Sequence, residues 1–575
     1  MSPLSEAALH SRAVAAFARR DYAEAEALLR RILVAQPGDR AARFNLAKVY
    51  EVTERYDAAA ELYGSIVAGA PDDAPALLRL GTVRYVQGRL EDAADAFAAA
   101  LRAAPDDPTA ALNLGIVLNA VGRFESAAHV LRTAAGAHPA IADIRCALAE
   151  ALRELHRDGE AAAEANAALA IEPGHVSARV VLGQVAYDRG DFDEAERCFA
   201  AAADDAPQRA EPRLNLGVLY HGLGRYGDAL ANAEAAVALA PGDPLAHFDL
   251  GLTLLLGGHY ERGFAEAEWR LRDPRARAQF ARVDAIPRWN GERLDGKRLL
   301  VAREQGLGDF VLWSRLFGEA ARRSNARVAV EMPPGLGDLY DGFPGIDDAF
   351  EEACPEDELA RADAHVPLCS LPYVLRVGDP ERAGVADGGR FGAGAVPYLL
   401  ADRVRVQAFR ERFARERGAV KVGVAWRGDP AHLLDRFRSC SLDAFASLRD
   451  VADVAWISLQ KGAHEAEALE PPPDFEVLAL GPELRTFADT AAAIAALDLV
   501  VAVDTSVVHL AGALGTPVWM LHGFGNYWLW GLEGGGSPWY PTLRVFRQHR
   551  PNDWTGVFAD VRAELRSFVA ARERD

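Results

Sequence analysis

The segment 502–518, AVDTSVVHLAGALGTPV, contains the residues best suited to bind a charged ligand. Asp504 ends an apolar run that predicts a strand, and Thr505 and Ser506 can cap the helix that follows it. His509 lies four residues after Thr505 and therefore on the same side of that helix. Because free backbone N–H groups at a helix N-terminus bind phosphate, these four residues predict a phosphate site. The alternative is that Thr505 or Ser506 only caps the helix and that His509 packs in the core.

A second informative segment is EQGLGDF at 304–310, whose glycine-containing turn follows a strand predicted over about 298–303. We predict that a helix begins near Asp309, which places this residue at the carboxyl edge of a parallel sheet, where α/β proteins bind ligands. A carboxylate in that position can take the proton from an attacking hydroxyl, so Asp309 is a candidate general base. Asp is also a common helix N-cap, and that role is the alternative.

Basic residues that could contact a phosphate lie between these two motifs along the chain. The loop VAWRGDPAHLLDRFRS offers Arg427, Arg436 and Arg438, and a guanidinium can neutralise the charge that develops on a phosphate leaving group. We favour Arg438, because its Arg-Ser step closes the loop. The stretch SLQKG places Gln460 and Lys461 at the end of the next predicted strand. For each residue the alternative is a solvated surface side chain.

An aromatic cluster follows in WLWGLEGGGSPWYP, which contains Trp528, Trp530, Trp539 and Tyr540 around the glycine run 534–536. Such a segment could form a lid or a stacking wall beside a sugar or a base. The alternative is a packing cluster of aromatic side chains.

The elements that must position these residues alternate as strands and helices after residue 275, which predicts α/β units around parallel sheets. We expect two Rossmann-like lobes, at 276–400 and 418–575, joined by a linker helix within 401–417, and a terminal helix over 557–572. Besides the strand at 298–303, apolar runs predict strands at 327–331, 364–367, from 421 onward, and at 454–460, 499–505, 517–523 and 543–548.

The first 275 residues carry an internal repeat of 34 residues, which predicts an α-solenoid. Pro breaks the chain before each repeat, and two small residues let the paired helices approach closely. Seven full repeats span about 6–243, and an eighth, degenerate repeat reaches about 275. This is the tetratricopeptide pattern, and its three series are Pro37, Pro71, Pro105, Pro139, Pro173, Pro207 and Pro241; the pairs that begin at Leu46, Leu80, Leu114, Leu148, Leu182, Leu216 and Leu250; and Ala25, Ala59, Ala93, Ala127, Ala161, Ala195 and Ala229.

Composition excludes several classes of protein. The formal charge of −20 over 575 residues argues against nucleic-acid binding, which needs a basic surface. No apolar stretch is long enough to cross a bilayer, and the opening residues show no secretory signal, so we expect a cytoplasmic protein without membrane insertion. The five cysteines form no CxxC pair and have no nearby histidines, which argues against disulfides and structural zinc.

The segment from 502 to 518 resembles the nucleotide-sugar site of the heptosyltransferase-like family of bacterial glycosyltransferases. Asp504, Thr505, His509 and Leu510 match its motif, whereas Ser506 replaces a glycine. The resemblance implies a GT-B fold that works without a metal or cofactor and binds a nucleotide-sugar donor. It also implies that Asp309 deprotonates the acceptor hydroxyl. The donor contacts then expected are Gln305, Gly308, Arg427, Arg438, Gln460, Lys461, Asp504, Thr505, Ser506 and His509.

The repeats resemble those of eukaryotic protein O-GlcNAc transferases, in which an Asn before each Leu-small pair holds the acceptor backbone. The matching residues here are Asn45, Asn113 and Asn215, the candidate acceptor contacts, although the alternative is that they are ordinary consensus residues. This series of Asn residues is interrupted, because the equivalent places in the other repeats are occupied by Arg79, Ala147, Val181 and Asp249.

Resemblance to bacterial tetratricopeptide glycosyltransferases extends over nearly the whole chain, including the segments AEAEWRLR and IPRWNGERLDGKRLL. Some of these proteins modify flagellin in the cytoplasm. The resemblance implies a protein O-glycosyltransferase that transfers a sugar, such as pseudaminic acid from a CMP-nonulosonic acid, to Ser or Thr of flagellin. The alternatives are a glycosyltransferase of envelope polysaccharide or lipopolysaccharide assembly, and a non-catalytic repeat scaffold with a degenerate transferase fold.

Overall fold

The computed structural model describes residues 6–378, 396–430, 435–525, 527–532, 535–551 and 553–572, without the side chains of Glu6, Pro274, Arg275 and Arg436. The chain forms two compact units, Met1–Pro207 and Gln208–Asp575. The boundary falls inside the repeat series, so the second unit contains the last repeats together with the α/β region.

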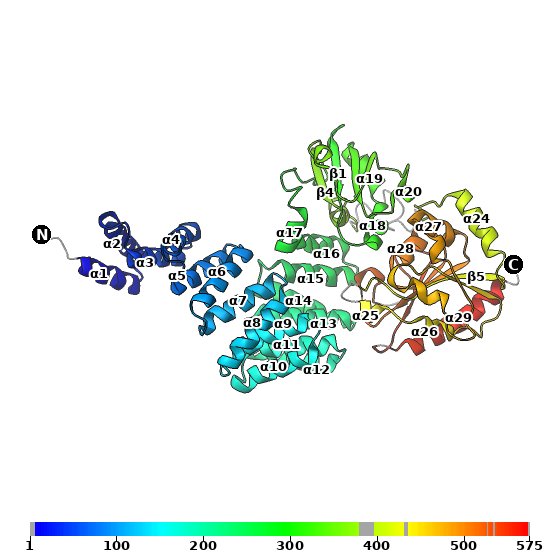
Figure 1. Cartoon of the computed structure of the whole chain (residues 1–575). Coiled ribbons are helices and arrows are strands. Elements are labelled where there is room, and N and C mark those ends of the chain that lie inside the picture. Colours follow the sequence, from blue (N-terminus) through cyan, green and yellow to red (C-terminus); the bar gives the residue numbers. More distant parts are fainter. Residues whose placement is uncertain are drawn as a thin grey trace. The chain divides into compact units, whose positions relative to one another are not determined.

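The first unit consists of antiparallel helix pairs, as the 34-residue period predicts (Figure 1). Asp39, Asp73 and Asp107 occupy the same place in successive repeats, and each accepts a hydrogen bond from a backbone N–H at the start of the next helix. The helices are α1 Glu6–Ala18, α2 Tyr22–Ala35, α3 Arg40–Val52, α4 Tyr56–Gly69, α5 Ala74–Val86, α6 Leu90–Ala103, α7 Pro108–Ala120, α8 Phe124–Ala137, α9 Ala142–Glu154, α10 Asp158–Ile171, α11 Val176–Asp188 and α12 Phe192–Asp205.

The repeated Leu-small pairs mark places where the two helices of a repeat nearly touch. A β-carbon added to Gly81 would lie 2.7 Å from the ring of Phe97, and one added to Gly183 would lie 2.5 Å from the ring of Phe199. The small residue therefore makes room for a large side chain of the second helix, which is the packing that the sequence predicted.

The second unit begins with the last two repeats. Their helices are α13 Ala210–Gly222, α14 Tyr226–Leu239, α15 Pro244–Leu256 and α16 Tyr260–Ala267, followed by the 3₁₀ helix η1 Glu268–Arg272 and by α17 Pro274–Phe280. Helix α16 is short, in agreement with the degenerate eighth repeat. Leu255, Leu256 and Phe264 from these helices share one hydrophobic core with the strands that follow. The end of the solenoid is therefore built into the α/β region.

The first sheet is parallel, with strand order β3-β2-β1-β4. Strand β3 was not predicted, because its residues DAFE are half exposed and form no apolar run. The strands are β1 Arg298–Ala302, β2 Arg327–Met332, β3 Asp348–Glu351 and β4 Ala364–Pro367. The helices between and after them are α18 Leu307–Ser314, α19 Phe317–Ser324, α20 Gly337–Tyr340, α21 Glu356–Leu359, η2 Leu368–Ser370 and α22 Leu371–Val374.

The second sheet is also parallel, with order β10-β9-β8-β5-β6-β7. Its strands are β5 Val420–Ala425, β6 Val454–Ser458, β7 Val477–Ala479, β8 Leu499–Val503, β9 Val518–His522 and β10 Leu543–Arg547. Its helices are α24 Arg403–Phe413, α25 Asp435–Arg438, α26 Leu442–Ala446, η3 Gly462–Leu469, η4 Gly481–Glu483, α27 Phe487–Ala495, α28 Ser506–Leu514, η5 Trp528–Trp530 and α29 Trp554–Arg572. Buried residues of α27 and α28 pack on one face of this sheet, and those of α26 and α29 pack on the other.

Two glycines at the same repeat position provide a matched test of this packing. A β-carbon on Gly251 would lie 2.7 Å from the backbone nitrogen of Ala267 and 2.9 Å from the carbonyl oxygen of Gly263, whereas one on Gly217 would find its nearest neighbour at 3.5 Å. We expect Gly251→Ala to lower the free energy of unfolding by about 1–3 kcal/mol, because backbone cannot yield as a side chain can. Gly217→Ala should be neutral or stabilising by up to about 1 kcal/mol, because Ala favours helix. Thermal unfolding of the two full-length variants checks this, and equal melting temperatures would contradict it.

Candidate functional site

The two motif segments lie against each other in the structure. Helix α18, which carries Gly308 and Asp309, packs on helix α28, which carries His509. A β-carbon on Gly308 would lie 2.7 Å from Cδ2 of His509, so only glycine permits this approach. Asp504 is close enough to Asp309 for its charge to raise the pKa of that carboxyl. The segments that follow β1 of the first sheet and β8 of the second thus bring together four predicted site residues, Gly308, Asp309, Asp504 and His509.

Asp309 is the third residue of α18 and is half buried. Its Oδ2 accepts a hydrogen bond of 3.3 Å from the backbone N–H of Gly306, so the carboxylate does help to cap the helix. Burial and, to a lesser extent, the carboxylates of Asp504 and Glu304 raise the pKa of Asp309 to about 6, while the hydrogen bond from the Gly306 N–H opposes this rise. A carboxyl of this pKa is mostly ionised at neutral pH and can still accept a proton, as a general base requires.

Asp504 directly follows β8, and its Oδ2 accepts a hydrogen bond of 2.9 Å from the indole Nε1–H of Trp530. Burial raises the pKa of Asp504, while the Trp530 bond and the charge of Arg438 lower it. The second carboxylate of the site is therefore held in place by an aromatic side chain from another segment.

The helix cap predicted at Thr505 or Ser506 is wrong in its detail. Thr505 occupies the N-cap position of α28, but its side chain makes no cap hydrogen bond, and Ser506 is the first helical residue. The Thr505 hydroxyl oxygen is buried and has no hydrogen-bond partner among the described residues. The hydroxyl and the N–H groups at the start of α28 thus remain available to a ligand.

His509 is buried, and its Nδ1 lies 3.0 Å from the hydroxyl of Tyr540. Burial and the charge of Arg315 together lower the pKa of His509 to about 3, so the imidazole is neutral. His509 brings no positive charge to a phosphate. Its role in this structure is to join α28 to Tyr540 and to pack against Gly308.

Arg438 lies close enough to Asp504 for its charge to lower the pKa of that carboxyl. Its Nε is 3.4 Å from Oδ1 of Asp435. The Nε of Arg427 is 3.6 Å from Oε1 of Glu467. The side chain of Arg436 lies outside the described residues. Arg438 therefore stays the preferred guanidinium.

The polar side-chain atoms of Gln460 are fully engaged, and those of Lys461 are partly engaged. Oε1 of Gln460 accepts from the backbone N–H groups of Trp426 and Arg427, each at 3.0 Å, and its Nε2 donates to the carbonyls of Arg427 and Lys461, each at 3.1 Å. Lys461 Nζ donates to the carbonyl of Gly481 at 2.8 Å and pairs with Glu465 at 2.7 Å. The structure gives Gln460 a bracing role for the loop after β5, and a donor contact of Lys461 stays a prediction.

Gln305 is exposed in the turn between β1 and α18, with a positive φ of 61°. A non-glycine residue in this backbone region is uncommon, and such residues are frequent near functional sites. The structure places Gln305 beside the Asp309 turn and shows no contact that ties its side chain to Asp309 or Asp504.

The aromatic segment is a packing cluster, so the lid that was one of its two interpretations is wrong for these side chains. Trp528, Trp530, Trp539 and Tyr540 are all buried. Trp528 and Trp539 contact the ring of Trp313 in α18, and Trp528 also contacts Phe264 in α16. The glycine run lies partly outside the described residues, because Gly534 is among those left out. The cluster ties the last repeat to the helix that carries Asp309.

The predicted acceptor contacts Asn45 and Asn113 are half exposed on α3 and α7 of the first unit. Asn215 on α13 uses its Nδ2 to donate to the carbonyl of Glu211 in its own helix at 2.9 Å. Asn215 is thus partly engaged locally.

Sequence reasoning missed a buried ion pair that holds the Asp309 turn. Arg270 of η1 forms two bonds with Glu304, from Nε to Oε1 at 2.6 Å and from Nη2 to Oε2 at 2.8 Å. Nη2 also donates to Ser370 at 2.9 Å, and Glu304 accepts from the backbone N–H of Cys369 at 3.2 Å. Both members were within the quoted segments AEAEWRLR and EQGLGDF, but only the fold shows that they meet.

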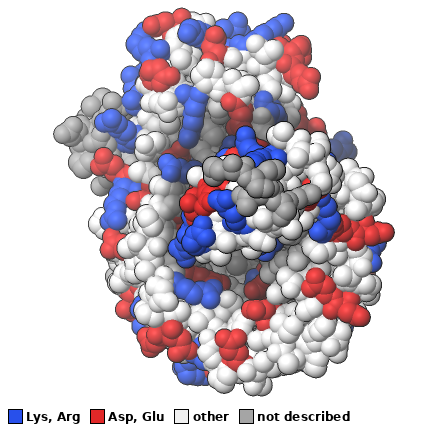
Figure 2. Space-filling model, turned by 90° about the vertical axis from the view of Figure 1, so that its left-hand side faces the viewer, with Lys and Arg blue, Asp and Glu red and all other residues white. Residues whose placement is uncertain are grey.

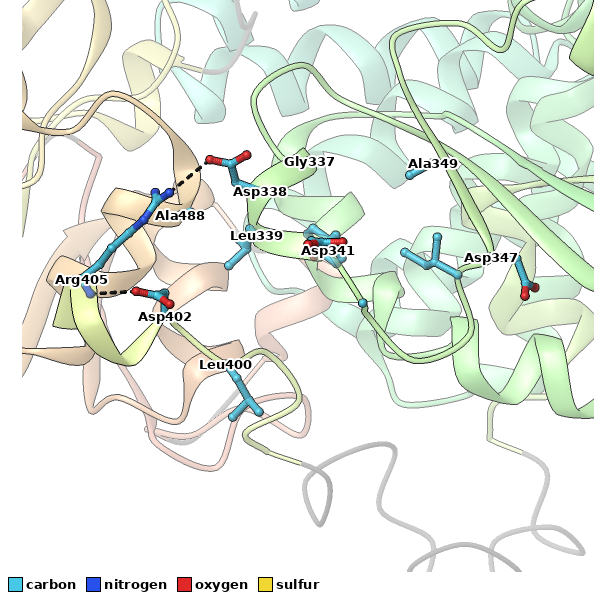
Figure 3. A pocket seen from close by; sticks show the side chains of 13 residues that line it. Gly337, Asp338, Leu339, Asp341, Asp347, Ala349, Leu400, Asp402, Arg405 and Ala488 are labelled. Atoms are coloured by element: carbon cyan, nitrogen blue, oxygen red, sulfur yellow. Dashed lines mark hydrogen bonds and ion pairs between the residues drawn. The ribbon is translucent and has the colours of Figure 1, made fainter.

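An open hollow of about 680 Å³ lies elsewhere in the unit, between the segment after β2 and the start of α24. Its lining residues include Asp338, Asp402 and Arg405, and Figure 3 shows Arg405 directed toward Asp338. Arg405 pairs with Asp338 at 3.3 Å and with Asp489 at 2.9 Å, so its charge is satisfied. None of the predicted site residues lines this hollow, and it is distinct from the candidate site.

Figure 2 shows Lys and Arg interspersed with Asp and Glu over the face that it draws. In the part of the chain that the structure describes, no three His, Cys, Asp or Glu side chains are grouped to hold a metal ion. No described helix is both long and apolar enough to cross a membrane.

Comparison with known families finds matches in two regions of the chain. The tetratricopeptide repeat model matches residues 10–74, 53–108, 78–120, 112–176, 180–244 and 222–271. The model of glycosyltransferase family 9 (heptosyltransferase) matches residues 454–555, a range that includes the Asp504–His509 motif.

Among curated proteins, Protein FlbA of Caulobacter vibrioides is 28% identical over 343 residues, which are 57% of this chain and 56% of that protein. The chain thus spans about half the length of the relative that it matches.

Among solved structures, a tetratricopeptide repeat protein from Parabacteroides merdae aligns at 15% identity with a TM-score of 0.40, covering 44% of this chain and 99% of that one. A thermophilic TPR protein of Thermus thermophilus aligns at 26% identity with a TM-score of 0.31, covering 32% of this chain and 99% of that one. The family matches show that the chain combines tetratricopeptide repeats with a heptosyltransferase-like region of glycosyltransferase family 9.

Proposed function

We propose that this protein is a glycosyltransferase of GT-B architecture that transfers a sugar from a nucleotide donor to a hydroxyl group of a protein acceptor. The observation that carries the proposal is the contact of α18 with α28, which brings Asp309 beside the family 9 motif at Asp504 and His509. The proposed base for the acceptor, Asp309, and the proposed phosphate site at the start of α28 therefore lie close together.

The chemistry follows from the residues present. The acceptor hydroxyl gives its proton to Asp309 as its oxygen bonds to the anomeric carbon of the sugar, and the bond between that carbon and the donor phosphate breaks. The nucleotide leaves with the electron pair. The N–H groups at the start of α28 and the guanidinium of Arg438 stabilise the negative charge on the leaving phosphate. This scheme needs no metal or cofactor.

The identities of the acceptor and of the sugar are proposed from the resemblance of the repeats and of the whole chain to known glycosyltransferases. We propose that the solenoid groove, including Asn45 and Asn113, holds the acceptor in the cytoplasm. We further propose Ser or Thr of flagellin as the acceptor and a nonulosonic acid such as pseudaminic acid, activated with CMP, as the donor sugar.

Intact-mass analysis of flagellin tests the acceptor. In the source bacterium, deletion of this protein should lower the flagellin mass by a whole number of sugar residues, and the wild-type chain should restore it. An unchanged flagellin mass in the deletion strain would remove flagellin as the acceptor. Binding of CMP, UDP, GDP and ADP to the purified chain tests the nucleotide separately, and binding of none of them would contradict the transferase proposal.

Asp309→Asn should abolish most of the transfer while leaving the fold intact. Asn keeps an oxygen that can accept from Gly306 but cannot take a proton, so kcat should fall by about 10²- to 10⁴-fold. The melting temperature and the Kd for the nucleotide should stay close to those of the wild type. The control is Asp357→Asn, an exposed change in the same lobe. Full activity of Asp309→Asn would reduce the role of this residue to a helix cap.

The rate of transfer should depend on pH through Asp309. Because burial raises its pKa to about 6, the base is ionised above this pH and protonated below it. We therefore expect kcat/KM to be level above about pH 7 and to fall about tenfold per pH unit well below pH 6. Steady-state rates between pH 4.5 and 8, with the melting temperature measured at each pH, check this. A flat profile down to pH 4.5 would exclude a base of this pKa.

A further inference from the structure

Three polar residues stand in a row where adjacent strands of the second sheet end. Asp504 follows β8, His522 ends β9 and Arg547 ends β10. His522 and Arg547 are direct partners in the strand pairing, and the pair formed by Val503 and Leu521 aligns Asp504 beside His522. Because side chains alternate along a strand, all three residues lie on the same face of the sheet, the face that α28 covers.

His522 presents a buried hydrogen-bond acceptor without a partner. Its side chain is 6% exposed, and its Nδ1 lies 2.7 Å from the carbonyl oxygen of Gly523, which can only accept, so Nδ1 carries the proton. Burial lowers the pKa of His522 to about 4, so the imidazole is neutral and Nε2 carries a lone pair. This Nε2 has no hydrogen-bond partner among the described residues. An unsatisfied buried acceptor destabilises the fold, and a bound ligand that donates to it can offset this cost.

Arg547 presents donors beside this acceptor. Its Nη2 donates to the carbonyls of Trp530 at 2.6 Å and Gly531 at 3.0 Å, which fixes the guanidinium. Its Nε and Nη1 are buried and have no hydrogen-bond partner in the described part of the chain. Burial lowers the pKa of Arg547, as expected for a cation that lacks a carboxylate partner. The charge of Arg547 also lowers the pKa of His522, which places the two groups close together.

Trp530 connects this pair to the candidate site. Its indole N–H bonds to Asp504, and its carbonyl accepts from Arg547. One aromatic residue therefore holds the carboxylate of the motif and the guanidinium of β10 in a fixed arrangement.

We propose that His522 and Arg547, together with Asp504, form the subsite for the sugar of the donor and select a sugar that bears a carboxylate group. Sugar hydroxyls donate to the Asp504 carboxylate and to His522 Nε2, and the carboxylate of the sugar accepts from Arg547. This inference rests on the proposed glycosyltransferase function. A carboxylate could also come from an acidic side chain of the acceptor, and the experiment below separates the two sources.

Isothermal titration of the full-length protein with CMP and with CMP-N-acetylneuraminic acid tests the proposal. The wild type should bind the sugar nucleotide at least about tenfold more tightly than CMP, as expected for a charged hydrogen bond. Arg547→Gln should remove this preference without changing the Kd for CMP. Arg544→Gln should keep it, because Arg544 is on the same strand and pairs at the surface with Glu564. A wild type without the preference, or an Arg547→Gln variant that retains it, would overturn the proposal.

A second variant guards against a change that merely disturbs the fold. His522→Phe removes the unsatisfied acceptor but keeps a ring, so its melting temperature should equal or exceed that of the wild type while the preference for the sugar nucleotide is lost. N-acetylglutamate supplies a carboxylate without a sugar, and Arg547-dependent binding of it alone would assign the pair to the acceptor and overturn the sugar subsite. Nucleotide binding by the wild type with no preference for the acidic sugar would leave the transferase function standing and remove only this inference.

Discussion

The ion pair between Arg270 and Glu304 connects the two architectures of the second unit. Arg270 lies in the short helix that ends the repeats, and Glu304 lies two residues after the first strand of the first sheet, five residues before Asp309. Both charges are buried, and removal of one partner would leave the other uncompensated at a cost of about 3–5 kcal/mol. The turn that presents Asp309 therefore depends on the last repeat. If the catalytic part of the chain were taken to begin after residue 275, it would lack Arg270, which pairs with Glu304, and Phe264, which packs in its hydrophobic core.

Most of the fold could be predicted from the sequence, because its signals are local. The 34-residue period follows from helix length and turn length, and the small residue at Gly81 or Gly183 reports directly on helix contact. Long apolar runs mark the central strands. The edge strands β3 and β7 carry no such run, because β3 is half exposed and β7 has three residues, and their identity depends on the neighbouring strand.

The candidate site was predictable only where a motif fixes the backbone. Gly308 and Asp309 were found because a turn after a strand places them at the sheet edge, and the same holds for Asp504. Whether a polar side chain is free or engaged depends on tertiary neighbours that a single sequence does not show. Gln460 is hydrogen-bonded to backbone groups of the loop after β5, and the four aromatic side chains of the segment 528–540 are buried in the core. His522 and Arg547 gave no local signal, since only the pairing of β9 with β10 places them side by side.

The boundary between the compact units at Pro207 coincides with one of the prolines that separate repeats. In a solenoid each repeat contacts only its neighbours, so whole repeats can be duplicated, lost or exchanged without disturbing distant ones. The repeats before this proline lie outside the unit that contains Arg270, Glu304 and Asp309. Evolution is thus free to lengthen or remodel the N-terminal repeats in 34-residue steps and to recruit new partners, while the chemistry downstream is inherited unchanged.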